Sequence, residues 1–160
     1  MRRALALVLL AAVSLPLAAR VRAVRSAAEV TPESWLRQRA VDDAGFVHLA
    51  RNASVVALGD ATHGTHEIYA AKQRLVPLLV DEGFRTIAFE APYAEWAKLD
   101  EYVVHGTGDP AAALNFRLYW FWDTDEILHL IEWARAQNAA GLTPPIRIAG
   151  VDSTEPASAA

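Results

Sequence analysis

The chain has 160 residues, which is enough for one domain, and its 53% hydrophobic and 21% charged residues are typical of a globular protein. Its formal net charge is −4, and no basic stripe is present to neutralise phosphates, so nucleic acid is not an expected partner. The sequence contains no cysteine, which excludes disulfides, thiolate metal sites and cysteine nucleophiles and leaves stability to an ordinary core.

The first 23 residues have the pattern of a secretory signal peptide. Met1-Arg2-Arg3 precedes an apolar run over residues 4–15 that only Ser14 interrupts, and small residues follow up to Ala23. The run is shorter than the roughly 20 residues that cross a bilayer, so export with cleavage is favoured over a membrane anchor. Cleavage would leave 11 basic and 19 acidic residues, a net charge of −8. We expect an acidic protein that is exported, periplasmic or secreted, with no stable membrane anchor after cleavage.

Residues 24–53 are expected to form a polar linker and a short N-terminal helix. Thr31 can cap this helix, and Pro32 suits the first helical position. The helix carries Trp35 and Leu36 and gives way near residues 42–45, where acidic residues and glycine follow. The remaining residues, 54–160, are expected to hold the main domain.

A continuous apolar run at residues 55–58 predicts a strand buried on both faces of a parallel sheet, and residues 86–89 and 146–151 are the second and third predicted strands. Apolar spacing over residues 67–82 predicts a helix between the first two strands, ending at Gly83 and kinked or divided by Pro77. Strand, helix and strand in this order make a right-handed βαβ unit. The predicted fold class is therefore α/β, a parallel sheet with βαβ units.

Three helices are expected between the second and third strands. Residues 93–104 are amphipathic, and a shorter helix follows and ends at Leu118. The third helix runs to about Asn138, with Asp123 or Thr124 as its cap. Glu126, in its first turn, can complete the cap.

An aromatic stretch, Tyr119-Trp120-Phe121-Trp122, lies just before Glu126. The pattern of Glu126 after Asp123 or Thr124 is that of a capping box. We interpret the aromatic stretch as core or as the wall of a cleft rather than as a platform that stacks on a ligand.

The loops after the three predicted strands carry the residues that can do chemistry. Parallel strands end on one edge of a sheet, so these loops are expected to converge although they are some thirty residues apart in sequence. The candidates are Asp60, His63, His66, Glu67, Glu90 and Asp152. Imidazoles beside carboxylates support proton transfer.

His63 is the predicted general base, because a histidine's ordinary pKa of about 6.5 suits a group that draws a proton from water. Asp60 or Glu90 could orient the ring and stabilise the imidazolium, as the acid of a hydrolase triad does. Water is the expected nucleophile. Thr62 and Thr65 stay open as covalent nucleophiles, and the sequence has no Gly-x-Ser-x-Gly elbow.

A metal site is the alternative role for the two histidines. His66 lies three residues after His63 with Glu67 beside it, but the His-Glu-x-x-His order and a third ligand are missing. We therefore predict no metal and no cofactor. His66, Glu67 and Asp152 are expected to contact the substrate.

Several motifs in register resemble the erythromycin esterase family. The first is Gly59-Asp60-Ala61-Thr62-His63-Gly64-Thr65-His66-Glu67-Ile68-Tyr69, followed by Ile87-Ala88-Phe89-Glu90, Phe121-Trp122-Asp123-Thr124-Asp125-Glu126 and Ile148-Ala149-Gly150-Val151-Asp152. The resemblance covers about residues 54–152. It implies hydrolysis of a carboxylic ester or macrolide lactone, with His63 as the base and acids of the first and second loops in support. The implied partner is a small-molecule ester or macrolide, and the implied biology is antibiotic resistance.

The resemblance also carries departures. Family members usually have Glu at the position of Asp60, and they are more than twice this length, with at least one further active-site histidine in the second half. We therefore expect residues 54–160 to be the N-terminal part of an esterase-like domain, truncated after the third strand. Two alternatives stay open: an inactive fragment, or a metal- or haem-binding envelope protein, since distant relatives of this fold bind such ligands.

Overall fold

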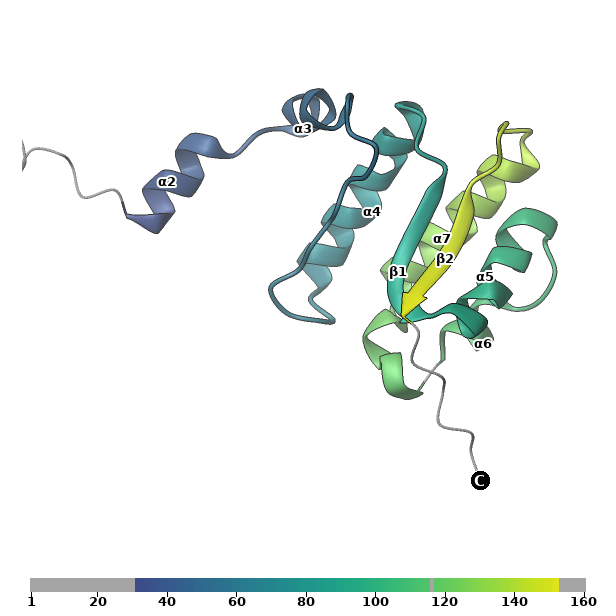
Figure 1. Ribbon diagram of the computed structural model, residues 1–160. Coiled ribbons are helices and arrows are strands. Elements are labelled where there is room, and N and C mark those ends of the chain that lie inside the picture. The colour runs from purple at the N-terminus through teal and green to yellow at the C-terminus, as the bar shows by residue number, and fades with distance from the viewer. Residues whose placement is uncertain (1–30, 116, 153–160) are drawn as a thin grey trace, which may run out of the picture. The chain divides into compact units, whose positions relative to one another are not determined.

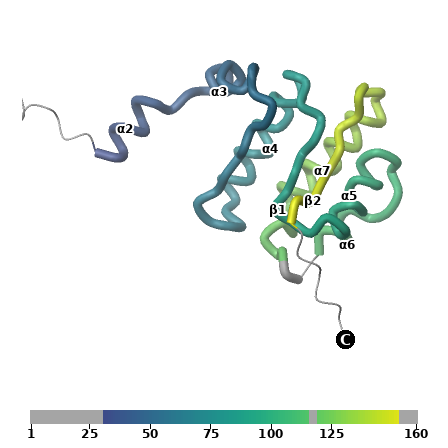
Figure 2. Tube along the Cα trace, in the orientation of Figure 1, coloured from purple at the N-terminus to yellow at the C-terminus, as the bar shows by residue number. Residues whose placement is uncertain are grey.

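The computed structural model describes residues 31–115 and 117–152 (Figures 1 and 2). The predicted signal peptide over residues 1–23 and the segment after Asp152 lie outside the described residues. Contacts divide the chain into two units, Met1–Asp42 and Asp43–Ala160. Within the described parts, no helix has the length and apolar character needed to cross a membrane.

The described part of the first unit holds helix α2 (Pro32–Arg39). Its start is as predicted, because Thr31 Oγ1 accepts a hydrogen bond from the Ser34 N–H at 3.1 Å and Pro32 is the first helical residue. Glu33 and Arg37 add an ion pair one turn apart on the exposed surface.

The second unit is built on a two-stranded parallel sheet of β1 (Thr86–Pro92) and β2 (Arg147–Asp152). Thr86 pairs with Arg147, and Phe89 pairs with Gly150. The helical elements are α3 (Asp43–Ala50), α4 (His66–Asp81), α5 (Tyr93–His105), α6 (Pro110–Leu114), the 3₁₀ helix η1 (Arg117–Trp122) and α7 (Asp125–Ala139). The chain is therefore a mixed α/β protein, as the sequence predicts.

Most predicted helices are confirmed. Helix α4 is not divided at Pro77, and Gly83 follows its end with a positive φ of 102°. At the start of α7, Thr124 Oγ1 accepts a hydrogen bond from the Ile127 N–H at 3.4 Å, so Thr124 is the cap. The helix expected to run to Leu118 is shorter and ends at Leu114, after which the chain turns into η1.

One local prediction is wrong, and one helix, α3, is not among those predicted. Residues 55–58 form no strand although their apolar run predicts a buried one. Val55 is 81% exposed, and no described backbone group pairs with this segment. A strand is stable only when a neighbour completes its hydrogen bonds, so the βαβ unit expected over residues 55–89 is not formed here.

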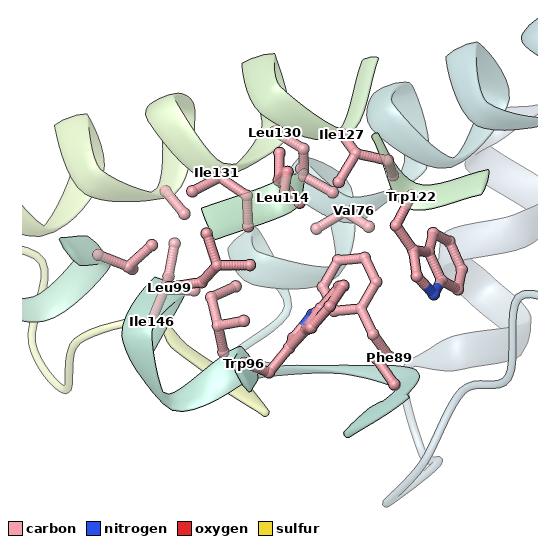
Figure 3. Close-up of a cluster of buried hydrophobic side chains, with 14 of the residues drawn as sticks. Val76, Phe89, Trp96, Leu99, Leu114, Trp122, Ile127, Leu130, Ile131 and Ile146 are labelled. Atoms are coloured by element: carbon pink, nitrogen blue, oxygen red, sulfur yellow. The ribbon is translucent and has the colours of Figure 1, made fainter. Parts of the chain in front are cut away.

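Helices α4, α5 and α7 bury one face of the sheet (Figure 3). Phe89 of β1 and Ile148 of β2 point into this core, where Trp96, Leu99 and Ile131 are fully buried. Thr86, Ala88 and Glu90 alternate with the buried residues of β1 and are exposed. The buried face therefore supplies the cohesion of this unit.

Two polar side chains join β2 to the helices. Asp100 of α5 accepts hydrogen bonds from the Arg147 guanidinium and from the Ile148 N–H at 2.9 Å. Burial alone would raise the pKa of Asp100, but these bonds outweigh it and lower that pKa. Asn138 of α7 donates to the carbonyls of Val103 and Ile146 and accepts from the Ile146 N–H at 2.7 Å.

Gly150 is required where the two strands approach most closely. A Cβ at this position would lie 2.5 Å from the carbonyl oxygens of Ala91 and Pro92, beside the irregularity in strand pairing. We expect Gly150→Ala to lower the free energy of unfolding by about 1–3 kcal/mol, because the backbone must move apart. Gly59→Ala is the matched control, since a Cβ there meets no atom within 4 Å. Urea unfolding of both variants checks this, and equal losses would contradict it.

Candidate functional site

The loop from Gly59 to Thr65 leads into α4 and is fastened to it. Gly64 has a positive φ of 73°, and its N–H donates to the Tyr69 hydroxyl at 3.2 Å. Burial is the main cause that raises the pKa of Tyr69, which keeps this phenol neutral. The hydroxyl of Thr65 donates to the Thr62 carbonyl at 3.2 Å. These contacts fix where the loop presents its polar side chains.

Asp60 lies between two basic groups. Its Oδ2 is 3.6 Å from Nδ1 of His63 and 3.5 Å from Nζ of Lys72. The side chains of Asp60 and Lys72 are 15% exposed, whereas that of His63 is 50% exposed. The ammonium of Lys72 thus lies against the carboxylate of Asp60, which in turn faces one nitrogen of the His63 ring. The other nitrogen, Nε2, is the one left for a water or a substrate.

The His63 ring also has a fixed plane. It stacks on Phe121 with a centroid distance of 4.4 Å and an interplanar angle of 14°. An imidazole held by a ring on its face and a carboxylate near its Nδ1 has few orientations left, which is the arrangement a general base needs.

The aromatic stretch Tyr119–Trp122 is both core and surface. Trp122 is buried and donates its Nε1–H to the Glu90 carbonyl at 3.1 Å, while Trp120 is 65% exposed and lies against Gly64. Trp122 is therefore core, as predicted, whereas Trp120 is a surface residue beside the loop.

Asp152 ends β2 and is joined to the same aromatic stretch. The Tyr119 hydroxyl donates to its carboxylate at 2.6 Å. The Tyr119 ring lies 5.8 Å from that of Phe121, which stacks on His63. The Asp60 loop and the end of β2 are thus connected through aromatic rings, so the predicted convergence of these two loops is reproduced in this structure.

His66 pairs with Glu126, a partner that the sequence analysis missed. Their side chains form a short hydrogen bond between the first turn of α4 and the first turn of α7. The pKa of Glu126 is lowered, first by its own backbone N–H and then by His66 and the Thr124 hydroxyl. The sequence pattern predicts only a capping role for Glu126. The pair with His66 could have been predicted from one feature, namely that both residues lie in the first turn of a helix that starts at the same edge of the sheet.

Glu67 and Glu90 are placed differently from the other candidates. Both are exposed, Glu67 in the first turn of α4 and Glu90 near the end of β1. The contact described for Glu90 is made by its backbone carbonyl, which accepts from Trp122, and the carboxylate 3.6 Å from His63 is that of Asp60. The acid beside His63 is therefore Asp60, and the roles predicted for Glu67 and Glu90 stay predictions.

Lys72 is the second residue that sequence reasoning undervalued. It lies within the helix predicted over residues 67–82, and no role in the site is predicted for it. Its Nζ also lies 5.4 Å from the ring centroid of Tyr69 and 5.8 Å from that of Trp122, so its charge is held among aromatic faces close to Asp60. Among the described residues, no three His, Cys, Asp or Glu side chains are grouped so that they could hold a metal ion.

The titration of Glu126 tests the pair with His66. In the intact chain we expect the Glu126 carboxyl to titrate below its ordinary value of 4.5. His66→Ala should raise this pKa only part of the way, because the backbone N–H and Thr124 still hydrogen-bond to the carboxylate. Carbon-detected NMR of the carboxyl against pH measures it. A pKa that is the same in both proteins would show that His66 does not contact Glu126 in solution.

Comparison with known proteins places this chain in a family. The sequence model of the family described as Erythromycin esterase matches residues 79–160, which include Glu90, Glu126 and Asp152 and follow the Asp60 loop. A relative from Bacillus subtilis (strain 168), named "Putative hydrolase YbfO", is 28% identical over 103 residues, which are 61% of this chain and 21% of that protein.

Two solved structures are similar as well. A succinoglycan biosynthesis protein is 37% identical with a TM-score of 0.62, and the match covers 68% of this chain and 27% of that one. A protein from Bacillus cereus is 25% identical with a TM-score of 0.53, over 71% of this chain and 34% of that one. The chain thus spans between about a fifth and a third of these relatives. The family match covers just over half of the sequence, and the chain belongs to the erythromycin esterase family.

Proposed function

We propose that this chain carries the water-activating part of an ester hydrolase, with His63 as the general base. The observation that carries the proposal is the placement of His63 between the Asp60 carboxylate and the Phe121 ring. Membership in the erythromycin esterase family and a relative named as a hydrolase support the reaction class.

The proposed reaction is the addition of water to an ester carbonyl. Nε2 of His63 takes a proton from water while the water oxygen attacks the carbonyl carbon. The Asp60 carboxylate, which also lies 3.5 Å from Nζ of Lys72, stabilises the imidazolium that forms. The ester C–O bond then breaks, and the imidazolium returns its proton to the departing alkoxide. The products are a carboxylic acid and an alcohol, which remain joined when the substrate is a lactone.

The start of α4 is the proposed site for the carbonyl oxygen. Thr65 at the N-cap makes no side-chain hydrogen bond to the helix, since its hydroxyl donates to Thr62. The first N–H groups of α4 therefore keep their donors for a developing oxyanion, where the helix dipole also favours negative charge. His66 and Glu67 lie in this first turn and would flank the substrate.

A macrolide lactone is the substrate we propose first, because the family's description names the esterase of a macrolide. Other carboxylic esters use the same chemistry and belong to the same proposal. The proposed exported location would place such an enzyme where it meets an antibiotic outside the cytoplasm.

The test is to incubate the whole chain with erythromycin and to follow the product that is heavier by one water by mass spectrometry. We expect His63→Ala to lower turnover by about 10²–10⁴-fold, since a positioned base contributes this much. His129→Ala is the matched control, because His129 is exposed on α7 and outside the site. Equal turnover by His63→Ala and the unchanged chain would overturn the role of His63.

A further inference from the structure

His66 and Glu126 form a second pair of histidine and carboxylate, near the pair of His63 and Asp60. Nδ1 of His66 hydrogen-bonds to the Glu126 carboxylate. Nδ1 of His63 faces the Asp60 carboxylate in the same way. Helices α4 and α7, which carry the second pair, both begin at the end of the sheet where β1 and β2 finish (Figure 1). The first pair moves the proton in the proposed reaction, so the second pair is available for another role.

One buried phenol lies close to both carboxylates. Tyr69 is 1% exposed, and its hydroxyl accepts a hydrogen bond from the Gly64 N–H at 3.2 Å. Burial is the largest cause that raises the pKa of Tyr69, and the negative charges of Asp60 and Glu126 raise it further. Because the effect of a charge weakens with distance, both carboxylates lie near this phenol. The two pairs of histidine and acid therefore belong to one site.

The ring of His66 offers one nitrogen to a ligand. Nδ1 contacts Glu126, so Nε2 is the nitrogen left for a further partner. The His66 side chain is 73% exposed, whereas that of Glu126 is 16% exposed. A protonated imidazole donates from both of its nitrogens. This ring can therefore hold the Glu126 carboxylate with one N–H and present the other to a substrate oxygen.

We propose that His66, in its protonated form, donates from Nε2 to the carbonyl oxygen of the substrate and stabilises the negative charge that develops there. This role rests on the proposed function, in which that oxygen lies at the start of α4, the helix that His66 begins. A hydrogen bond from a cation strengthens as the oxygen gains charge. No proton leaves His66, so the proton transfers stay with His63. Glu126 acts through His66 and is a positioning residue.

A contact that only joins α4 to α7 is the competing role for this pair. Such a contact needs the bond from Nδ1 and places no requirement on Nε2. The two helices are already joined through the core, in which Val76 of α4 and Leu130 of α7 are both buried. An ion pair with an exposed partner adds little stability to a packed contact of this kind. The pair is therefore better explained by the exposed nitrogen of the ring.

The other titratable groups of the packed elements have to be separated from His66 in a test against pH. Glu126 stays ionised near neutral pH because its pKa is lowered, and Tyr69 stays neutral because its pKa is raised. A further set lies in the loop before α4, in the first half of α4 and near the start of α7, namely Asp60, His63, Glu67, Lys72, Asp125 and His129. Histidines ordinarily change charge between about pH 5 and 8, so the two in this set are replaced in controls.

Binding of ethyl phenylphosphonate tests the proposal without any measurement of turnover. This tetrahedral anion resembles the adduct of water and an ester carbonyl, which an enzyme binds more tightly than the substrate. The chain is used with His63→Ala, so that the charge of His63 does not contribute. We expect the affinity, measured by titration calorimetry, to fall at least about 10-fold from about pH 5.5 to about pH 8.5, because His66 loses its charge over this range.

Variants in the same background locate the effect. His66→Gln keeps a neutral donor, so its affinity should be about 10-fold lower at about pH 5.5 and nearly the same at about pH 8.5. His66→Lys keeps a cation at both pH values and should remove the fall. Glu126→Gln keeps an acceptor for Nδ1–H and should retain most of the affinity that Glu126→Ala loses. His129→Ala is the matched control and should reproduce the profile of the background, since His129 is exposed one turn further along α7.

The proposal is overturned by any of three results. A fall with pH that persists in both His66 variants would assign the effect to another group. Equal affinity of His66→Gln and the background at about pH 5.5 would leave the pair as a contact between helices. Absence of phosphonate binding at both pH values would show that His66 holds no oxyanion. The expected binding profile together with no hydrolysis of erythromycin by the unchanged chain would instead refute the proposed function alone.

Discussion

The indole of Trp122 is the contact on which the site and the sheet both depend. Its Nε1–H donates to the Glu90 carbonyl at the end of β1, and its ring packs edge-on against Phe89 and face-on against Tyr69. One buried side chain thus ties η1 to β1 and α4 together. An unpaired indole N–H in this position would cost about 1–3 kcal/mol, so the hydrogen bond also sets the register of η1 against the strand.

Because Trp122 is fixed, its neighbours in η1 have fixed positions too. Phe121 supplies the surface on which His63 stacks, and Tyr119 holds Asp152. The candidate site is therefore organised by a short aromatic segment that contacts the loop before α4 and the ends of both strands. The sheet provides the edge where these loops meet, and the aromatic segment determines the orientation of the His63 and Asp152 side chains at that edge.

The sequence predicts the parts of the molecule that depend on local patterns. The caps at Thr31 and Thr124 and the apolar runs of β1 and β2 concern neighbours in sequence, and each is present. Asp60 beside His63 is also a local pair. Glu126 joins α7 to α4 through His66, 60 residues away in the chain, and Lys72 of α4 contacts Asp60 in the loop before that helix; no pattern within one segment reveals either contact. The strand predicted at residues 55–58 fails for a related reason, since a strand is a property of two segments and no described segment pairs with this one.

Asn138 has a consequence for how this fold can change over evolution. Its side-chain amide holds the Val103 carbonyl and both backbone groups of Ile146, so the entry into β2 is positioned from α7 rather than by the chain between them. Residues 140–145 of that connection therefore do not have to determine the direction of β2. Insertions and deletions there should accumulate among relatives without displacing Asp152, provided that the asparagine is kept.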